Sequence, residues 1–109
     1  MRKFVLFGAS GDLAIKKIYP GMYFNYKNGF NCEYIGYGRT KLSDISFRKI
    51  VKESIGENDA KFLKKFSYVM GSYDKERLAN LKDQLENSEQ IIYYLSLPNR
   101  LDIVKNLIN

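Results

Sequence analysis

The sequence predicts an α/β protein with a doubly wound parallel sheet, and three observations support this class. Short apolar segments alternate with longer segments in which apolar residues recur at helical spacing. The resulting order, βαβαβαβα, is typical of strands joined by crossover helices. The strand segments are almost continuously apolar, as expected where both faces of a parallel sheet are covered. A full sheet of this kind usually has about five or six strands, so we expect an incomplete one in the order 3-2-1-4.

The first part of the chain predicts two strands with a helix between them. Residues 3–7 are a compact run of β-branched and aromatic residues that ends at Gly8, as a buried strand would. Residues 13–27 have the spacing of a helix. Pro20 lies inside that helix and predicts a kink or a break into two helical pieces. Residues 32–38 predict the second strand.

The rest of the chain predicts three more helical segments, two strands and a last helix. Ser43 and Asp44 can cap a helix that ends at Gly56. A short helical segment (58–66) and the third strand (66–71) follow it. After them come a helix (74–85), the fourth strand (90–97) and, after Pro98, a last helix (101–108). The apolar stripe of the last helix is expected at Leu101, Val104, Leu107 and Ile108. The fourth strand would be an unprotected sheet edge, which favours aggregation.

Composition narrows the possible functions. The 109 residues suffice for one modest domain, and no apolar run approaches the length of a membrane span. The net charge is +6, but the lysines are scattered among acids, so we expect no nucleic-acid partner. The single cysteine, Cys32, fits a reducing cytoplasm. No metal-ligand cluster is expected, and the chain contains no histidine.

The segment from Gly8 to Gly11 has the context of a phosphate-binding turn. It follows a strand directly and opens a helix, and the pattern is G-x-x-G-x-x-A through Ala14. The glycines permit a tight turn and a close approach of a pyrophosphate, which the helix N-terminus would attract. The alternative is a plain βα turn with Asp12 or Ser10 as the helix N-cap, and the two interpretations are compatible. The sequence thus predicts a Rossmann-like cofactor site.

The end of the second strand favours NADP over NAD. An acidic residue there would bind the ribose hydroxyls of NAD, whereas this strand is followed by Arg39. A guanidinium can hold a 2′-phosphate with paired donors while it stacks on adenine. The alternative is an ordinary solvated arginine.

Four segments together resemble the glucose-6-phosphate dehydrogenase family. "FGASGDLAIKKIYPGMY" is similar to the family's "GASGDLAKKKIYP", and "YIGYGRTKL", "FSYVMGSYD" and "YYLSLPNRL" follow in the family's order. The resemblance implies that Lys17 contacts the sugar phosphate of the substrate. The chain departs from the family at Ile15, where a basic residue is common. The resemblance also implies a set of cofactor-binding residues: Gly8, Ala9, Ser10, Gly11, Asp12, Leu13, Ala14 and Arg39.

By this resemblance, residues 1–109 are expected to be the N-terminal part of an NADP-binding domain. The family transfers a hydride from C1 of glucose 6-phosphate to NADP, which gives 6-phosphoglucono-lactone and opens the oxidative pentose phosphate pathway. The family's base is a histidine in a later motif, and its substrate and oligomerisation domain also comes later. We therefore expect no catalytic residue in this chain and no turnover by it alone, although full-length members form homo-oligomers.

Two other functions remain open at this stage. The first is a non-catalytic NADP-binding module or sensor, which needs the glycine turn and Arg39 but no histidine. The second is an atypical short-chain reductase. The Lys-x-x-Tyr-Pro continuation of the turn argues against the reductase.

Overall fold

The computed structural model describes residues 2–96 and 101–108, and it contains one parallel sheet. The strands of the sheet are β1 (Arg2–Phe7), β2 (Glu33–Gly38), β3 (Phe66–Met70) and β4 (Gln90–Leu95). Their order is β3-β2-β1-β4, which confirms the predicted order, and every pair is parallel. Val5 at the centre of β1 lies opposite Ile35 of β2 and Tyr93 of β4.

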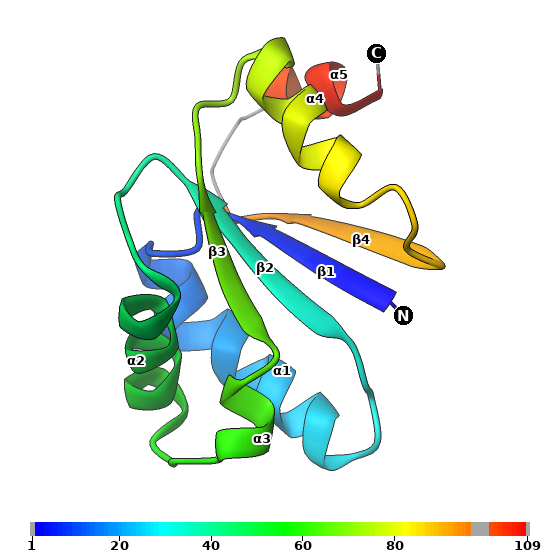
Figure 1. The fold of residues 1–109 in the computed structure, drawn as a ribbon. Coiled ribbons are helices and arrows are strands. Elements are labelled where there is room, and N and C mark those ends of the chain that lie inside the picture. The colour runs from blue at the N-terminus through cyan, green and yellow to red at the C-terminus, as the bar shows by residue number, and fades with distance from the viewer. Residues whose placement is uncertain (1, 97–100, 109) are drawn as a thin grey trace.

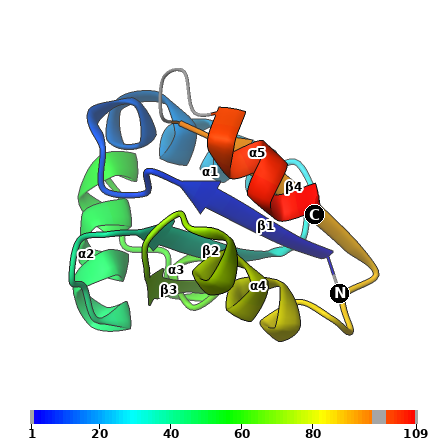
Figure 2. The ribbon, with the colours of Figure 1, turned by 90° about the horizontal axis from the view of Figure 1, so that it is seen from above.

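Helices cover both faces of this sheet (Figures 1 and 2). They are η1 (Ala14–Ile18), α1 (Tyr19–Lys27), α2 (Asp44–Ile55), α3 (Ala60–Leu63), α4 (Lys75–Gln84) and α5 (Leu101–Ile108). The helices η1, α1, α2 and α3 lie on one face, and α4 and α5 lie on the other. The doubly wound class is therefore confirmed. In the part of the chain that the structure describes, no helix is both long and apolar enough to cross a membrane.

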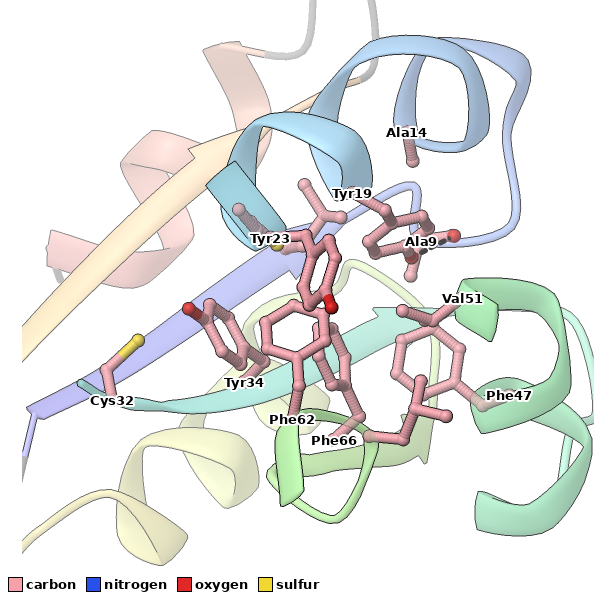
Figure 3. Close-up of a cluster of buried hydrophobic side chains, with 13 residues drawn as sticks. Ala9, Ala14, Tyr19, Tyr23, Cys32, Tyr34, Phe47, Val51, Phe62 and Phe66 are labelled. Carbon is pink, nitrogen blue, oxygen red and sulfur yellow. Dashed lines mark hydrogen bonds between the residues drawn. The ribbon is translucent and has the colours of Figure 1, made fainter. Parts of the chain in front are cut away.

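Two hydrophobic cores hold the layers together. The core beneath α1 and α2 is largely aromatic (Figure 3). In it, the rings of Tyr34 and Phe66 stack with their centroids 4.5 Å apart, and Phe62 meets Phe66 edge-on at 5.0 Å. The opposite core joins Val5 and Phe7 of β1 to the leucines of α4 and to a buried residue of α5. Burying each such side chain stabilises the fold by about 1.5–3 kcal/mol, so β1, which contributes to both cores, is the centre of the domain.

Side chains cap the starts of α2 and α4, and the predicted cap of α2 at Ser43 is confirmed. Ser43 Oγ accepts the Ser46 backbone N–H at 3.1 Å, and Gly56 ends α2 with a φ of 73°. Asp74 Oδ1 accepts the Arg77 N–H at 2.9 Å and so begins α4. These caps are local interactions, which is why sequence alone could place them.

The predicted break near Pro20 is confirmed as a change of helix type. Residues 14–18 form a π-helical segment in which the Tyr19 N–H donates to the carbonyl of Ala14, five residues back. In that register the carbonyl of Ile15 would need an N–H from Pro20, which has none. Ser54 Oγ of α2 donates to this carbonyl instead. The α-helical register then resumes at Tyr19, with Pro20 in the first turn of α1.

The predicted stripe on the last helix is wrong at one position. Ile103 is fully buried, whereas Val104 is 38% exposed. The helix turns Ile103 toward the core that it shares with α4, and the predicted stripe residue Leu107 packs against the same core. Pro98 lies outside the described residues.

Strand β4 is an edge of the described sheet, as predicted. It pairs only with β1, and Tyr93 and Tyr94 on it are 37% and 40% exposed. Whether this edge promotes aggregation stays a prediction.

Candidate functional site

The glycine turn lies at the carboxyl end of β1, between the two neighbouring strands. Gly8 has a φ of 80°, a left-handed conformation that glycine adopts without strain. Its N–H donates to the carbonyl of Tyr37 in β2 at 3.2 Å. On the other side, the Ser96 hydroxyl that follows β4 donates to the carbonyls of Phe7, at 2.5 Å, and Gly8, at 3.1 Å. The Gly11 N–H closes the turn on the Gly8 carbonyl at 3.0 Å. Both adjacent strands therefore fix the turn.

Tyr19 holds the turn from the side of the aromatic core. Its hydroxyl donates to the carbonyl of the buried Ala9, as Figure 3 shows. The Tyr19 ring meets Phe47 and Phe66 edge-on, with ring centroids 6.0 Å away in each case. Burial raises the pKa of Tyr19 well above its ordinary value, so the hydroxyl keeps its proton and remains a donor at neutral pH. The segment after the glycine turn thus helps to set its shape.

The first turn of the helix that follows the glycine turn has backbone N–H groups for which the described residues provide no acceptor. The Ile15 N–H donates to the Gly11 carbonyl at 3.1 Å. The N–H groups of the three residues before Ile15 belong to the first turn, where a helix offers no internal acceptor. These donors and the helix dipole favour an anion at this end.

The expectation that Asp12 or Ser10 caps this helix is wrong. No side-chain hydrogen bond caps the helix start in the described chain. Asp12 already lies inside the first helical turn, one residue too late to be the N-cap. Ser10 Oγ instead lies 3.3 Å from Thr40 Oγ1 in the segment after β2. This contact ties the glycine turn to the neighbourhood of Arg39.

A hollow of about 280 Å³ joins the glycine turn to the end of β2. We call it the nucleotide hollow, and its lining residues are Gly8, Ser10, Gly11, Gly38, Arg39, Thr40 and Tyr73. The Arg39 guanidinium carbon lies 5.3 Å from the centroid of the Tyr73 ring. This cation–π contact holds the guanidinium beside the glycine turn.

The predicted cofactor residues divide into three groups. Gly8, Ser10, Gly11 and Arg39 line the nucleotide hollow. Asp12 and Leu13 are exposed at the helix start, and Ala9 and Ala14 are buried in the core. Ala9 and Ala14 therefore offer a ligand only their backbone, while their small side chains allow the helix to pack against the sheet.

Lys17 lies apart from these residues. It is exposed on η1 and does not line the nucleotide hollow. Its expected contact with substrate stays a prediction.

Sequence reasoning missed Tyr73 and Ser96. Both follow strands, Tyr73 after β3 and Ser96 after β4. Because the carboxyl ends of parallel strands share one edge, polar residues directly after any strand were candidates for the site. That signal was present in the sequence.

The shape of the turn favours glycine at two positions. A Cβ at Gly11 would lie 3.3 Å from the Gly8 carbonyl oxygen, so a side chain there would crowd the turn. The Gly8 conformation disfavours every other residue. A parallel sheet with a glycine turn, a helix N-terminus and an arginine at its carboxyl edge defines a dinucleotide-binding domain of the Rossmann type.

Comparison with known proteins identifies the family within that class. The family described as "Glucose-6-phosphate dehydrogenase, NAD binding domain" matches residues 5–108. A glucose-6-phosphate 1-dehydrogenase of Caenorhabditis elegans is 39% identical over 87% of this chain, and a cytoplasmic isoform of Solanum tuberosum is 35% identical over 86%. This chain belongs to the glucose-6-phosphate dehydrogenase family. It spans 22% of the length of each of these two relatives.

A solved structure supports the same assignment. A glucose-6-phosphate dehydrogenase in complex with glucose 6-phosphate matches 97% of this chain with a TM-score of 0.86 and 33% identity. The matched region is 26% of that protein's chain.

Proposed function

We propose that this chain forms the phosphate- and adenosine-binding part of the NADP site of a glucose-6-phosphate dehydrogenase. The observation that carries the proposal is the nucleotide hollow, where the glycine turn and Arg39 line one cavity. Gly11 and Arg39 are 28 residues apart in the sequence, and the sheet brings them together.

Each group in the hollow has a distinct role. The N–H groups at the start of the helix bind the pyrophosphate, and Gly8 and Gly11 let it approach the backbone. Arg39 binds the 2′-phosphate through paired N–H donors. Tyr73 holds the Arg39 guanidinium and provides an aromatic face next to it. The exposed side chain of Lys17 is available for the phosphate of the sugar.

The proposed reaction is the oxidation of glucose 6-phosphate at C1 to 6-phosphoglucono-lactone. NADP, when bound, supplies the hydride acceptor. A base must remove the proton of the C1 hydroxyl group as the hydride leaves. These 109 residues contain no histidine, so a histidine base cannot come from them. We therefore expect this chain to bind the cofactor without turning over substrate.

Two features of the working protein are part of the proposal. We place it in the cytoplasm, because Cys32 is unpaired and buried and the potato relative is named a cytoplasmic isoform. We also propose that the enzyme works as a homo-oligomer through segments other than those described.

The second candidate is a non-catalytic NADP-binding module or sensor. The nucleotide hollow favours it equally, because that hollow needs no catalytic base. To distinguish the two, the chain is combined with the catalytic part of a longer relative. If it then binds NADP but shows no dehydrogenase activity, the sensor is favoured over the enzyme.

The proposal is tested by titrating the purified chain with NADP and with NAD, with and without Arg39→Ala. Loss of a charged, paired contact is expected to weaken NADP binding by about 1.5–3 kcal/mol and to leave NAD almost unaffected. Lys41→Ala, which removes a nearby charge outside the hollow, is the matched control. Equal losses for both nucleotides, or no binding of either, would contradict the proposal.

A further inference from the structure

A second hollow adjoins the nucleotide hollow and shares Arg39 with it. It has a volume of about 320 Å³ and is lined by Arg39, Met70, Gly71, Ser72 and Arg77. Arg39 directly follows β2, whereas Arg77 lies in the first turn of α4. Two guanidinium-bearing residues from separate elements therefore line one cavity at the carboxyl edge of the sheet.

The backbone beneath this second hollow is held rigidly. The Gly71 N–H donates to the carbonyl of Gly38, the last residue of β2, at 2.9 Å. The Tyr37 hydroxyl donates to the Ser72 carbonyl at 2.6 Å. A Cβ at Gly71 would lie 2.2 Å from the Tyr37 oxygen, so the segment after β3 is pressed against β2. These contacts fix the position of Arg39 relative to the start of α4.

The backbone of Arg77 is also fixed. Asp74, the N-cap of α4, accepts the Arg77 backbone N–H and the Ser72 hydroxyl. Among the residues that the structure describes, no acidic side chain forms an ion pair with the Arg77 guanidinium. Asp74 balances at most one of the two guanidinium charges, so the hollow keeps a net positive charge.

A phosphate monoester matches this arrangement. It carries a charge of about −1.5 to −2 at neutral pH and three acceptor oxygens. One guanidinium can neutralise only part of that charge, whereas two can donate paired hydrogen bonds from different sides.

We propose that Arg77 is a second specificity-determining residue for the 2′-phosphate of NADP, acting together with Arg39. This inference rests on the proposed function, since it assumes that the nucleotide hollow holds NADP. The cofactor residues predicted from the sequence lie in the glycine turn and directly after β2. This inference adds a residue of α4 to them.

The test is a titration of the purified chain and its variants with NADP and NAD. Arg77→Ala is expected to weaken NADP binding about tenfold and to change NAD binding by less than about twofold. Arg77→Gln, which keeps most of the side chain, should behave like Arg77→Ala. Lys75→Ala is the matched control, because Lys75 carries the same charge on the same helical turn but does not line the hollow. Circular dichroism of each variant verifies folding.

A double variant tests whether both arginines contact the same phosphate. If they do, the NADP losses of Arg39→Ala and Arg77→Ala are expected to be non-additive in the double variant.

The possible outcomes separate the inference from the proposed function. If the unaltered chain binds no NADP, or Arg39→Ala weakens both nucleotides alike, the proposed function fails and the inference with it. If Arg39→Ala is selective for NADP but Arg77→Ala is not, the proposed function stands and the inference is overturned. The inference is also overturned if Lys75→Ala matches Arg77→Ala, because the effect would then be one of general charge.

Discussion

Gly71 is a residue at which one added methyl group is expected to disturb both the fold and the site. A Cβ there would lie 2.2 Å from the Tyr37 hydroxyl oxygen and 2.8 Å from the ring carbon that carries it. Gly71→Ala should therefore destabilise the domain by about 1–3 kcal/mol, because either the ring or the backbone must move. Urea unfolding followed by circular dichroism measures the effect.

Gly21 provides the matched control for that substitution. It lies in α1 with no atom within 4 Å of a Cβ. Gly21→Ala is expected to stabilise the chain by about 0.5–1 kcal/mol, since alanine loses less backbone entropy in a helix. Equal effects of the two substitutions would show that crowding against Tyr37 is not what matters at Gly71.

At the scale of single residues, the sequence was sufficient where the interaction is local. Ser43 could be assigned as a helix cap and Asp74 as the start of a helix, because a cap bonds to a residue three positions later. Tyr73 was not assigned to the nucleotide hollow, although it follows a predicted strand, because its contact with Arg39 joins segments that are far apart in the sequence. Asp12 was assigned wrongly because the helix begins one residue earlier than its pattern indicated.

The element on which the turn most depends is the π-helical segment η1. Its register leaves the Ile15 carbonyl without a backbone donor, and Ser54 Oγ of α2 donates to it. Ser54→Ala should destabilise the chain by about 1–3 kcal/mol, because the carbonyl loses its partner. Chemical denaturation monitors this loss.

A second substitution tests the reason for the loss. Pro20→Ala restores an N–H five residues after Ile15, so Ser54→Ala should cost less in that background. A coupling above about 0.5 kcal/mol in the double-mutant cycle is expected. If Ser54→Ala costs the same with and without Pro20, the serine does not act by replacing the missing N–H.

The positions of helices and strands were predicted better than the faces that they bury. The apolar runs placed all four strands, because each strand is a short, nearly continuous run of apolar residues. The face of α5 was misjudged, since Ile103 rather than Val104 meets α4. Which face of a short apolar helix turns inward depends on its tertiary partner, and the sequence of the helix alone does not contain that information.

At the scale of the whole molecule, buried tyrosines set the response to alkaline pH. Burial raises the pKa of Tyr34 and Tyr19 well above the ordinary value of 10.0, and it raises that of Tyr68 to about 12. Because the folded pKa values lie above the unfolded one, these groups contribute fully to stability below pH 10.0 and lose that contribution as the pH rises through the folded pKa values. The free energy of unfolding should therefore fall above pH 10.0.

Tyr34→Phe isolates part of this effect. Apart from the Cys32 thiol, which forms only weak hydrogen bonds, the buried Tyr34 hydroxyl has no hydrogen-bond partner among the described residues, so its removal should cost little stability at neutral pH. Unfolding curves taken at a series of alkaline pH values should show a shallower fall for the variant. If the free energy of unfolding falls equally with pH in the two proteins, the pKa of Tyr34 does not differ between the folded and unfolded states.

Amide-resolved NMR during an NADP titration shows whether NADP binds at the carboxyl edge of the sheet. The chain offers a competing basic hollow at the opposite, amino ends of β2 and β3, lined in part by Arg48, Lys61 and Lys65. Our expectation is that the largest shifts fall on residues 8–14 and on Arg39, with little change around the basic hollow. Shifts confined to the basic hollow would contradict it, because NADP would then be bound only as a generic anion.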